Sequence, residues 1–393
     1  MGQREPVAEN KRFGRYLRQM REQRRLSLDA VEEMSLDLPG RVTKSHLSRI
    51  ENGRATPTFP RMFTLSRIYG VPVSHIAERF ELCIKFAMFP PVAATKPVTE
   101  VLDEAKRLRI AGRHTEALLF YESLLERSAE VPEEDRARWV IDLRLECINC
   151  LVKLSREASA KEECEKLLGS PDLRPLQQVV TLQYLAMCCY RLGKFTVAMM
   201  AIDRAEQELT QLDQTNDLGA FLAVLKGNLL FVTQRHAQAA EAFRVADRVF
   251  QELSNPFEAC RTQLNLAAAL IELGTLSEAR VLLQRALLVA ESAGYDRQRA
   301  YASSHIGFLA YREGKREEAE SHFLRSNLLA RPREYVSVLF RNCYYLWKIA
   351  RAREDEAGVK TNERTLRTYL SRVEGHMPEA EEFIAFLGGG KNE

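Results

Sequence analysis

The sequence predicts an all-α protein in which a small N-terminal domain of five helices precedes a longer stack of about six to seven antiparallel helix pairs. Three observations lead to this fold class. Apolar residues recur at helical spacing through most of the chain, a proline-bearing segment at residues 90–97 divides it, and beyond that segment one pattern returns about every 40 residues. With 393 residues, of which 46% are hydrophobic, the chain is long enough for two or three domains.

The first 89 residues favour five short helices, separated by prolines and turn residues. We expect these helices at about 11–24, 27–35, 43–52, 60–69 and 73–87. Residues 1–10 have no apolar period, which predicts a loose arm. Because prolines end helices and stiffen linkers, we place the domain boundary in a linker at residues 90–97, after a helical domain at residues 11–89.

The third predicted helix is the most informative part of this domain. Thr43 has a hydroxyl that can cap the first amides of a helix, Leu47 and Ile50 share an apolar stripe, and Gly53 lies where a helix usually ends. The side chains outside the stripe can donate hydrogen bonds: Lys44, Ser45, His46, Ser48 and Arg49. Such a row suits the edges of bases in a major groove.

This region resembles the Xre class of helix-turn-helix domains, to which the lambda-type repressors belong. The resemblance covers about residues 10–80 and rests on the ending Ile50-Glu51-Asn52-Gly53-Arg54 followed by Pro57, on Phe13 to Arg18 with Arg21 as the first helix, and on Leu26-Ser27-Leu28 opening the second. It implies that the helix after Thr43 is a recognition helix for double-stranded DNA.

Two features depart from that class. The turn Ser35 to Arg41 is roughly five residues longer than usual, which leaves the angle between the second and third helices open. The family also often has a DNA-contacting Gln where this chain has Leu28, so we expect no direct contact there.

The charge is unevenly distributed. The net charge of the whole chain is +3, but residues 1–80 contain 15 Lys and Arg against 9 Asp and Glu, which leaves −3 for the rest. A basic excess favours contact with phosphates. The DNA-binding set that we predict is Thr43, Lys44, Ser45, His46 and Arg49 at the recognition helix, with Arg54, Thr58, Arg15 and Arg18 for phosphates.

Beyond the linker the sequence repeats. A small or polar turn residue is followed by Ala about five positions later, an apolar residue four further on, and a small or apolar residue three after that. The turn positions are Gly112, Ser155 in a weaker copy, Gly193, Gln234, Gly274 and Gly314, and the last four are 41, 40 and 40 residues apart. A degraded seventh pair is expected at about Glu334 to Val373, so the repeat domain spans 98–373, with a capping helix and tail at 374–393.

This pattern resembles the tetratricopeptide repeat, in which small residues let two antiparallel helices approach closely. Small residues also recur seven positions before the turns, at Ala105, Ala186, Gly227, Ala267 and Gly307. The period near 40 exceeds the common 34, which predicts longer helices and wider turns. The resemblance implies a right-handed α-solenoid whose inner wall is formed by the first helix of each pair.

Polar residues recur on those first helices and predict a ligand-binding groove. The set is Asn149, Gln183, Tyr184, Asn228, Arg261, Asn265, His305, Arg341 and Asn342. Asn228, Asn265, His305 and Asn342 are separated by 37, 40 and 37 residues, close to the repeat itself. An Asn amide both donates and accepts hydrogen bonds, so a row of them suits an extended peptide backbone. Alternatively, each is simply a solvated or inter-helix polar residue.

The sequence gives no support for catalysis, a cofactor or a membrane span. Phosphate-binding loops, zinc-protease motifs and nucleophile elbows are missing. Eight cysteines are scattered through apolar-periodic sequence and predict reduced core residues, and Cys147 and Cys150 have no second pair to complete a metal site. With neither a long apolar run nor an export signal, we expect a cytoplasmic protein that is not an enzyme.

The combined architecture is similar to the peptide-pheromone-sensing transcription regulators of Gram-positive bacteria and their phage relatives. That resemblance implies a homodimer on a two-half-site operator, with a short peptide in the groove that shifts the DNA-binding domains. The alternative is an adaptor that resembles an antitoxin, in which the repeats hold a folded partner protein and DNA binding serves autoregulation. The operator, the ligand and the direction of regulation do not follow from the sequence.

Overall fold

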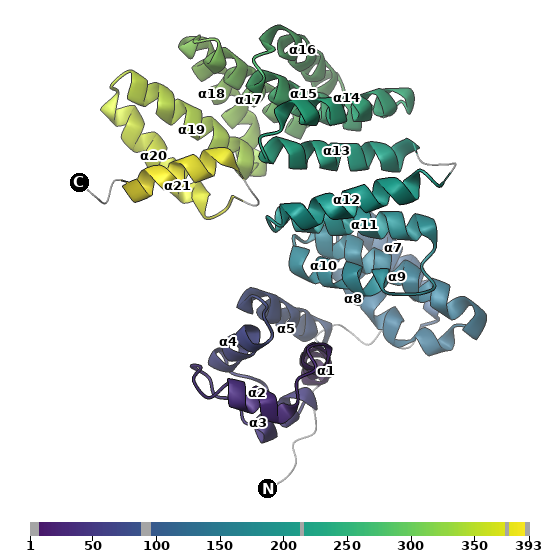
Figure 1. Ribbon diagram of the computed structural model, residues 1–393. Helices are drawn as coiled ribbons and strands as arrows, with labels where there is room; N and C mark the ends of the chain where they lie inside the picture. Colours follow the sequence, from purple (N-terminus) through teal and green to yellow (C-terminus); the bar gives the residue numbers. More distant parts are fainter. Residues whose placement is uncertain (1–7, 88–95, 213–215, 374–376, 390–393) are drawn as a thin grey trace. The chain divides into compact units, whose positions relative to one another are not determined.

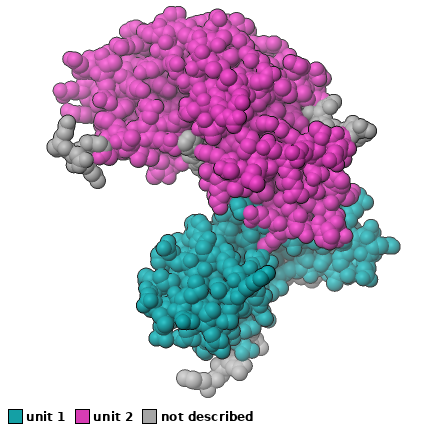
Figure 2. All heavy atoms as spheres, in the orientation of Figure 1, with its two compact units in different colours: residues 1–163 teal, residues 164–393 magenta. Residues whose placement is uncertain are grey.

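The computed structural model describes residues 8–87, 96–212, 216–373 and 377–389, and every regular element in these ranges is a helix. Their contacts divide the chain into two compact units, residues 1–163 and 164–393 (Figure 2). The predicted N-terminal arm at 1–10 and the predicted linker at 90–97 lie mostly outside the described residues. The DNA-binding-type domain and the first helices of the repeat region therefore belong to one unit.

The N-terminal domain consists of the five helices that the sequence predicts. They are α1 (Ala8–Gln23), α2 (Leu28–Met34), α3 (Lys44–Glu51), α4 (Phe59–Ile68) and α5 (Val73–Ala87). Its core contains the apolar stripes of all five helices, with Phe13, Leu17, Val31, Leu47, Leu65 and Ile76 each at most 1% exposed. Burial of these stripes stabilises helices that are too short to form alone.

At Gly14 the backbone of α1 is in direct contact with the backbone at the end of α3. A Cβ atom placed on Gly14 would lie 2.3 Å from the carbonyl oxygen of Ile50 and 2.6 Å from that of Glu51. Only glycine fits there. Beside this contact the Arg21 guanidinium donates to both carboxylate oxygens of Glu51, at 2.7 and 2.8 Å. Such a bidentate pair fixes orientation as well as distance, so α1 and α3 are held together rigidly.

The residues that the structure describes from 96 onward form seven consecutive helix pairs and a final helix (Figure 1). The pairs are α7 (Val98–Ile110) with α8 (His114–Glu126), α9 (Glu133–Lys153) with α10 (Glu157–Leu168), α11 (Pro175–Arg191) with α12 (Phe195–Leu209), α13 (Asn216–Val232) with α14 (His236–Glu252), α15 (Pro256–Glu272) with α16 (Leu276–Ser292), α17 (Asp296–Arg312) with α18 (Arg316–Ala330), and α19 (Val336–Ala352) with α20 (Glu356–Leu370). Helix α21 (Pro378–Gly389) follows the last pair. This number agrees with the six to seven pairs that the sequence predicts.

The turn residues of the repeat have the backbone conformation that reverses the chain within each pair. All six predicted turn positions have positive φ angles: Gly112 (76°), Ser155 (54°), Gly193 (70°), Gln234 (62°), Gly274 (77°) and Gly314 (79°). Four of these six are glycine, the residue that adopts this conformation without steric cost. The repeat in the sequence thus reflects a repeat in backbone geometry.

Small residues form the seams between paired helices, as the sequence predicts. The alanines that follow the turns are all fully buried: Ala117, Ala160, Ala198, Ala239, Ala279 and Ala319. Gly227 packs directly on the Phe243 ring, where a Cβ atom would come within 2.5 Å, and Gly307 packs on the Phe323 ring in the same way at 2.8 Å. Small and large residues face each other across the seam, which gives close packing without voids.

Candidate nucleic-acid interface

The start of α3 is fixed by two side chains that accept hydrogen bonds from its first amides. The Thr43 hydroxyl oxygen accepts from the His46 N–H at 3.2 Å, as predicted for a capping residue, and the Glu32 carboxylate of α2 accepts from the Lys44 N–H at 2.8 Å. These bonds satisfy amides that have no partner inside the helix. They also attach α3 to α2 across the turn.

The predicted DNA-reading row faces outward from α3. Lys44, Ser45 and Arg49 are exposed, whereas His46 and Ser48 are half-buried. The Lys44 ammonium lies 2.9 Å from the Asp29 carboxylate. Both groups are exposed, so this ion pair is weak and Lys44 can exchange it for another anion or acceptor.

His46 is neutral at pH 7. Partial burial lowers the pKa of its imidazole, and the nearby charges of Arg61 and Arg49 lower it further. The Nε2 atom has no hydrogen-bond partner in the described part of the chain. A neutral imidazole can donate from one ring nitrogen and accept at the other. Because Nε2 is buried, a contact between His46 and a base edge would have to use Nδ1.

The long turn between α2 and α3 is held in one conformation by side-chain hydrogen bonds. The Ser35 hydroxyl is fully buried; it donates to the Glu32 carbonyl at 2.8 Å and accepts from the Val42 N–H at 3.0 Å. At the other end, the Gly40 N–H donates to the Thr64 hydroxyl of α4 at 3.1 Å. The turn is therefore fixed at Ser35 and at Gly40, while Leu36, Asp37 and Pro39 between them are exposed.

The residues predicted to bind phosphates are all exposed, but two of them have acidic partners. Arg18 lies 2.9 Å from Glu22 on the same helix, and Arg15 lies 3.1 Å from Glu126 on α8. Arg54 follows α3, and Thr58 precedes α4 without capping it. Arg15 thus points toward the repeats, whereas Arg54 and Thr58 flank the recognition helix in sequence.

Most residues of the predicted ligand groove are half-buried on the first helices of their pairs. This group comprises Asn149, Gln183, Tyr184, Asn228, Arg261, Asn265 and Arg341. The Asn265 amide donates to the Asn228 side-chain carbonyl at 3.1 Å, so α13 and α15 are joined by this pair. The Arg341 guanidinium lies 2.9 Å from the Glu379 carboxylate of α21.

Two members of the predicted ladder are enclosed by the protein. Asn342 is fully buried, and its amide donates to Ser326 at 2.8 Å and to Asn327 at 2.9 Å while its carbonyl accepts from Ser304 at 2.7 Å. His305 is 4% exposed, and burial lowers its pKa to about 3, with a further contribution from the Arg341 charge. We therefore remove His305 and Asn342 from the groove set, because neither presents a free polar group to solvent.

A pocket of about 490 Å³ lies between α14, α15 and α16. It is lined by Phe250, Gln263, Arg285 and Val289 among others, and contains none of the predicted ligand residues. All eight cysteines are buried. Among the described residues no cluster of His, Cys, Asp and Glu could hold a metal ion, and no helix has the length and apolarity to cross a membrane.

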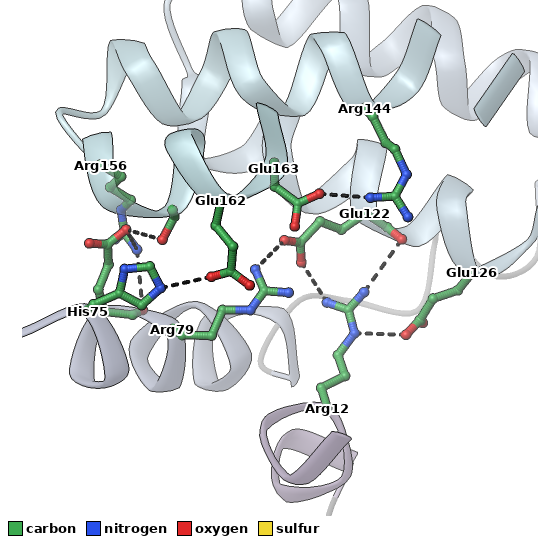
Figure 3. Close-up of polar contacts among 11 residues, drawn as sticks. Arg12, His75, Arg79, Glu122, Glu126, Arg144, Arg156, Glu162 and Glu163 are labelled. Atoms are coloured by element: carbon green, nitrogen blue, oxygen red, sulfur yellow. Dashed lines mark hydrogen bonds and ion pairs between the residues drawn. The ribbon is translucent and has the colours of Figure 1, made fainter. Parts of the chain in front are cut away.

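Sequence reasoning missed a set of ion pairs between the N-terminal domain and the first two helix pairs (Figure 3). The Glu122 carboxylate of α8 forms ion pairs with Arg12 of α1 at 2.7 Å and with Arg79 of α5 at 3.0 Å. These partners are 110 and 43 residues apart in the chain. Charged residues at such separations give no local pattern, so the contact could not have been found before the fold.

The comparisons with known proteins agree with this architecture. Residues 12–78 match the family model of a helix-turn-helix domain. The chain therefore carries an N-terminal helix-turn-helix domain, followed by an all-helical domain with a fold like that of tetratricopeptide repeats. No curated protein sequence matches the chain.

Solved structures of peptide-sensing regulators share the fold at low sequence identity. NprR in complex with its cognate peptide NprX is 17% identical over 74% of this chain and 83% of its own, with a TM-score of 0.56. The apo form of the quorum sensor NprR from B. thuringiensis is 18% identical over 70% and 77%, with a TM-score of 0.55. A Rap protein complexed with Competence and Sporulation Factor is 15% identical over 70% and 78%, with a TM-score of 0.54. At these identities the likeness concerns the fold alone.

Proposed function

We propose that this protein is an Xre-class transcription regulator that reads a specific DNA sequence with α3. The observation that carries the proposal is the outward row of Ser45, His46 and Arg49 on a helix whose other side is buried and whose start is capped. In a helix-turn-helix domain the second helix of the motif enters the major groove with its first residues at base edges. Arg49 is the residue best suited to a bidentate contact with guanine, and Arg54 and Thr58 hold adjacent phosphates.

The repeats serve as the sensor in this proposal, and a short peptide is their ligand. The similarity in fold to NprR with its peptide NprX and to a Rap protein with its peptide factor supports this assignment. The groove set is Asn149, Gln183, Tyr184, Asn228, Arg261, Asn265 and Arg341. The Asn228 to Asn265 pair is the best anchor for a peptide backbone, because each amide has hydrogen-bonding capacity beyond the single bond that joins them. Such a protein acts in quorum sensing and binds DNA as a homodimer.

A second candidate function is an adaptor whose repeats hold a folded partner protein. Large apolar side chains on the second helices favour it: Met200, Val281, Leu288 and Leu328 are each at least 65% exposed. Exposed apolar side chains that form one contiguous patch are typical of protein interaction surfaces. The same residues are available for homodimerisation under the first candidate.

The first experiment is binding of the full-length protein to DNA fragments from upstream of its own gene. We expect a complex that survives excess non-specific DNA and whose affinity falls steeply between a low and a high salt concentration. Weak and unselective binding that neither cell extract nor synthetic peptides restore would sink the regulator proposal.

The two candidates differ in what binds to the repeats. A peptide sensor binds a short synthetic peptide in isothermal titration without another protein present. An adaptor instead co-purifies with a folded partner in a fixed ratio. The double variant Asn228→Ala/Asn265→Ala should abolish the first kind of binding and leave the second unchanged.

A further inference from the structure

The surface between the N-terminal domain and the first two helix pairs is built around one buried carboxylate. Glu122 has a side chain that is 11% exposed, and Arg12 is 13% exposed. Arg12 also reaches Glu126 at 2.8 Å and stacks on the Phe86 ring, with its guanidinium carbon 3.4 Å from the ring centre. The arginine is thus enclosed by two carboxylates and an aromatic face. A buried charge is retained only when its partners are in place.

A second cluster lies further along the same surface and has the opposite polarity. Arg156, in the turn before α10, donates to the Glu78 carbonyl at 3.3 Å and to the Glu81 carboxylate at 3.2 Å, both on α5. The Ser159 hydroxyl donates to the Glu78 carboxylate at 2.8 Å. At the Glu122 cluster the N-terminal domain supplies the positive charges, whereas here it supplies the negative ones.

Between these clusters, His75 of α5 faces Glu162 of α10. The His75 Nε2 atom lies 3.1 Å from the Glu162 carboxylate, and the imidazole ring is stacked on Tyr16 of α1 at 6.2 Å between ring centres. His75 is 6% exposed. The surface therefore combines the polar pairs of Figure 3 with ring contacts of Tyr16 on α1 and Phe86 on α5.

The alternation of charge specifies a single docked orientation. If the N-terminal domain were turned end for end, Arg12 and Arg79 would meet Arg156, and Glu78 would meet Glu122. Like charges placed together in a buried surface are strongly unfavourable, so complementary patterns select register and orientation. The recognition helix lies outside this surface, because the described partners of the α8 and α10 residues come from α1 and α5.

We propose that α8 and α10 form a docking surface to which Glu122 fixes the DNA-binding domain, so that this domain and residues 98–163 move as one rigid body. We call this attachment the lock. Binding of a ligand to the repeats then moves α8 and α10, and this movement reorients the recognition helix. The locking itself does not depend on DNA binding, whereas its regulatory consequence rests on the function proposed above.

Distances between spin labels on the full-length protein test the lock directly. Cysteine replaces exposed Arg67 on α4 and exposed Lys106 on α7, and the eight native cysteines are buried away from the label. We expect double electron–electron resonance to show one narrow distance distribution. A broad distribution in this parent protein would overturn the proposal.

Two variants remove the lock from opposite sides. Glu122→Gln keeps the shape of the side chain but removes its charge, and Arg12→Gln/Arg79→Gln leaves the repeats untouched. Each should replace the narrow distribution by a broad one. Glu116→Gln is the matched control on α8, since Glu116 pairs only locally with Arg113 in an exposed bridge, and it should leave the distribution narrow.

Circular dichroism identifies any variant that has lost helix content. If Glu122→Gln disturbs the fold of α8, the double arginine variant decides the outcome, and an unchanged narrow distribution there contradicts the proposal. The readout is taken without DNA. Failure of the protein to bind DNA would therefore overturn the function proposed above and leave the lock intact, and the two failures are distinguishable.

A DNA fragment that the protein binds allows the consequence to be tested as well. Inserting about five base pairs between two half-sites rotates one of them by half a helical turn. The parent protein should discriminate strongly against the insertion, and Glu122→Gln should lose most of that discrimination. Equal discrimination by both proteins would show that Glu122 does not set the placement of the DNA-binding domain.

Discussion

Two rows of polar side chains follow helical faces in this protein, and they differ in their exposure to solvent. On α3 the row from Lys44 to Arg49 faces outward, and its exposed members are engaged at most by weak surface pairs. On the first helices of the repeats a similar row ends inside the protein, where Asn342 is fully buried and completely hydrogen-bonded. A polar row thus indicates a binding surface only where no other helix covers it.

For Asn342 the angular position on its helix accounts for the burial. The repeat period is close to 40 residues, but two of the three ladder intervals are 37. A shift of three residues turns a side chain by about 60° around an α-helix. Asn342 is consequently directed toward Ser326 and Asn327 of α18 and lies between the helices.

The largest effect that separates the two rows is expected for Asn342→Ala. It leaves the buried Ser304 hydroxyl and the Asn327 side-chain carbonyl without their partner, whereas Ser326 keeps its bond to the Ala300 carbonyl. Each unsatisfied group costs about 1 kcal/mol or more, so the loss of unfolding free energy should be about 2 kcal/mol or more. Asn228→Ala, at a half-buried position, should cost about 1 kcal/mol or less. Urea denaturation measures both. Equal losses would contradict the distinction between buried and accessible members of the row.

The acid sensitivity of the repeats should depend on His305. Its pKa is about 3 in the folded protein against an ordinary value of 6.5, so the unfolded chain binds the proton more readily. The sign of the effect follows: stability is complete above pH 6.5 and falls as the pH drops from 6.5 toward 3. At pH 5 the loss should be about 2 kcal/mol.

Thermal denaturation at pH 7.5 and pH 5, in the parent protein and in His305→Gln, measures this term. The variant should lose less stability than the parent between the two pH values. Identical pH dependence in both proteins would show that His305 is accessible to solvent.

The outward row is tested by Arg49→Ala. If Arg49 contacts guanine with both donors, the binding free energy for the preferred sequence should weaken by about 1–3 kcal/mol, and discrimination at one base pair should relax. Unfolding stability should be unaffected because Arg49 is exposed. Arg67→Ala, an exposed arginine on α4, is the control. A uniform loss of affinity for all sequences would instead identify Arg49 as a phosphate contact.

The smallest effect concerns Arg15, which we predicted to bind a phosphate and which pairs with Glu126 instead. This pair is exposed, so Arg15→Gln should change stability by about 0.5 kcal/mol or less. The slope of log affinity against log salt concentration decides its role. An unchanged slope assigns Arg15 to the repeats, whereas a decrease of about 1 assigns it to DNA.

The sequence was sufficient to predict elements that depend on local or periodic signals. The capping role of Thr43, the turns at Gly193 and Gln234, and the close approach at Gly227 each follow from a residue and its near neighbours. Such features recur at fixed spacing or at helix ends, where one residue type is strongly favoured.

Features that depend on distant pairs could not be predicted in this way. Nothing near Glu122 in the sequence marks it as the partner of Arg12 and Arg79, and the position of Asn342 between α18 and α19 depends on the twist accumulated along the repeats. In the sequence, Arg12, Arg15 and Arg21 are simply basic residues of one helix. The fold divides them, since Arg12 and Arg15 face the repeats and Arg21 binds Glu51.

The glycine contact between α1 and α3 has a mechanical consequence. Where side chains separate two helices, changes of rotamer normally absorb small displacements of one helix against the other. At Gly14 the two backbones touch with no side chain between them. Earlier on the same helix, Arg12 forms an ion pair with Glu122 of α8. Helix α1 therefore connects α8 to the end of α3 through two close contacts, so we expect a small shift of α8 to move the end of α3 as well.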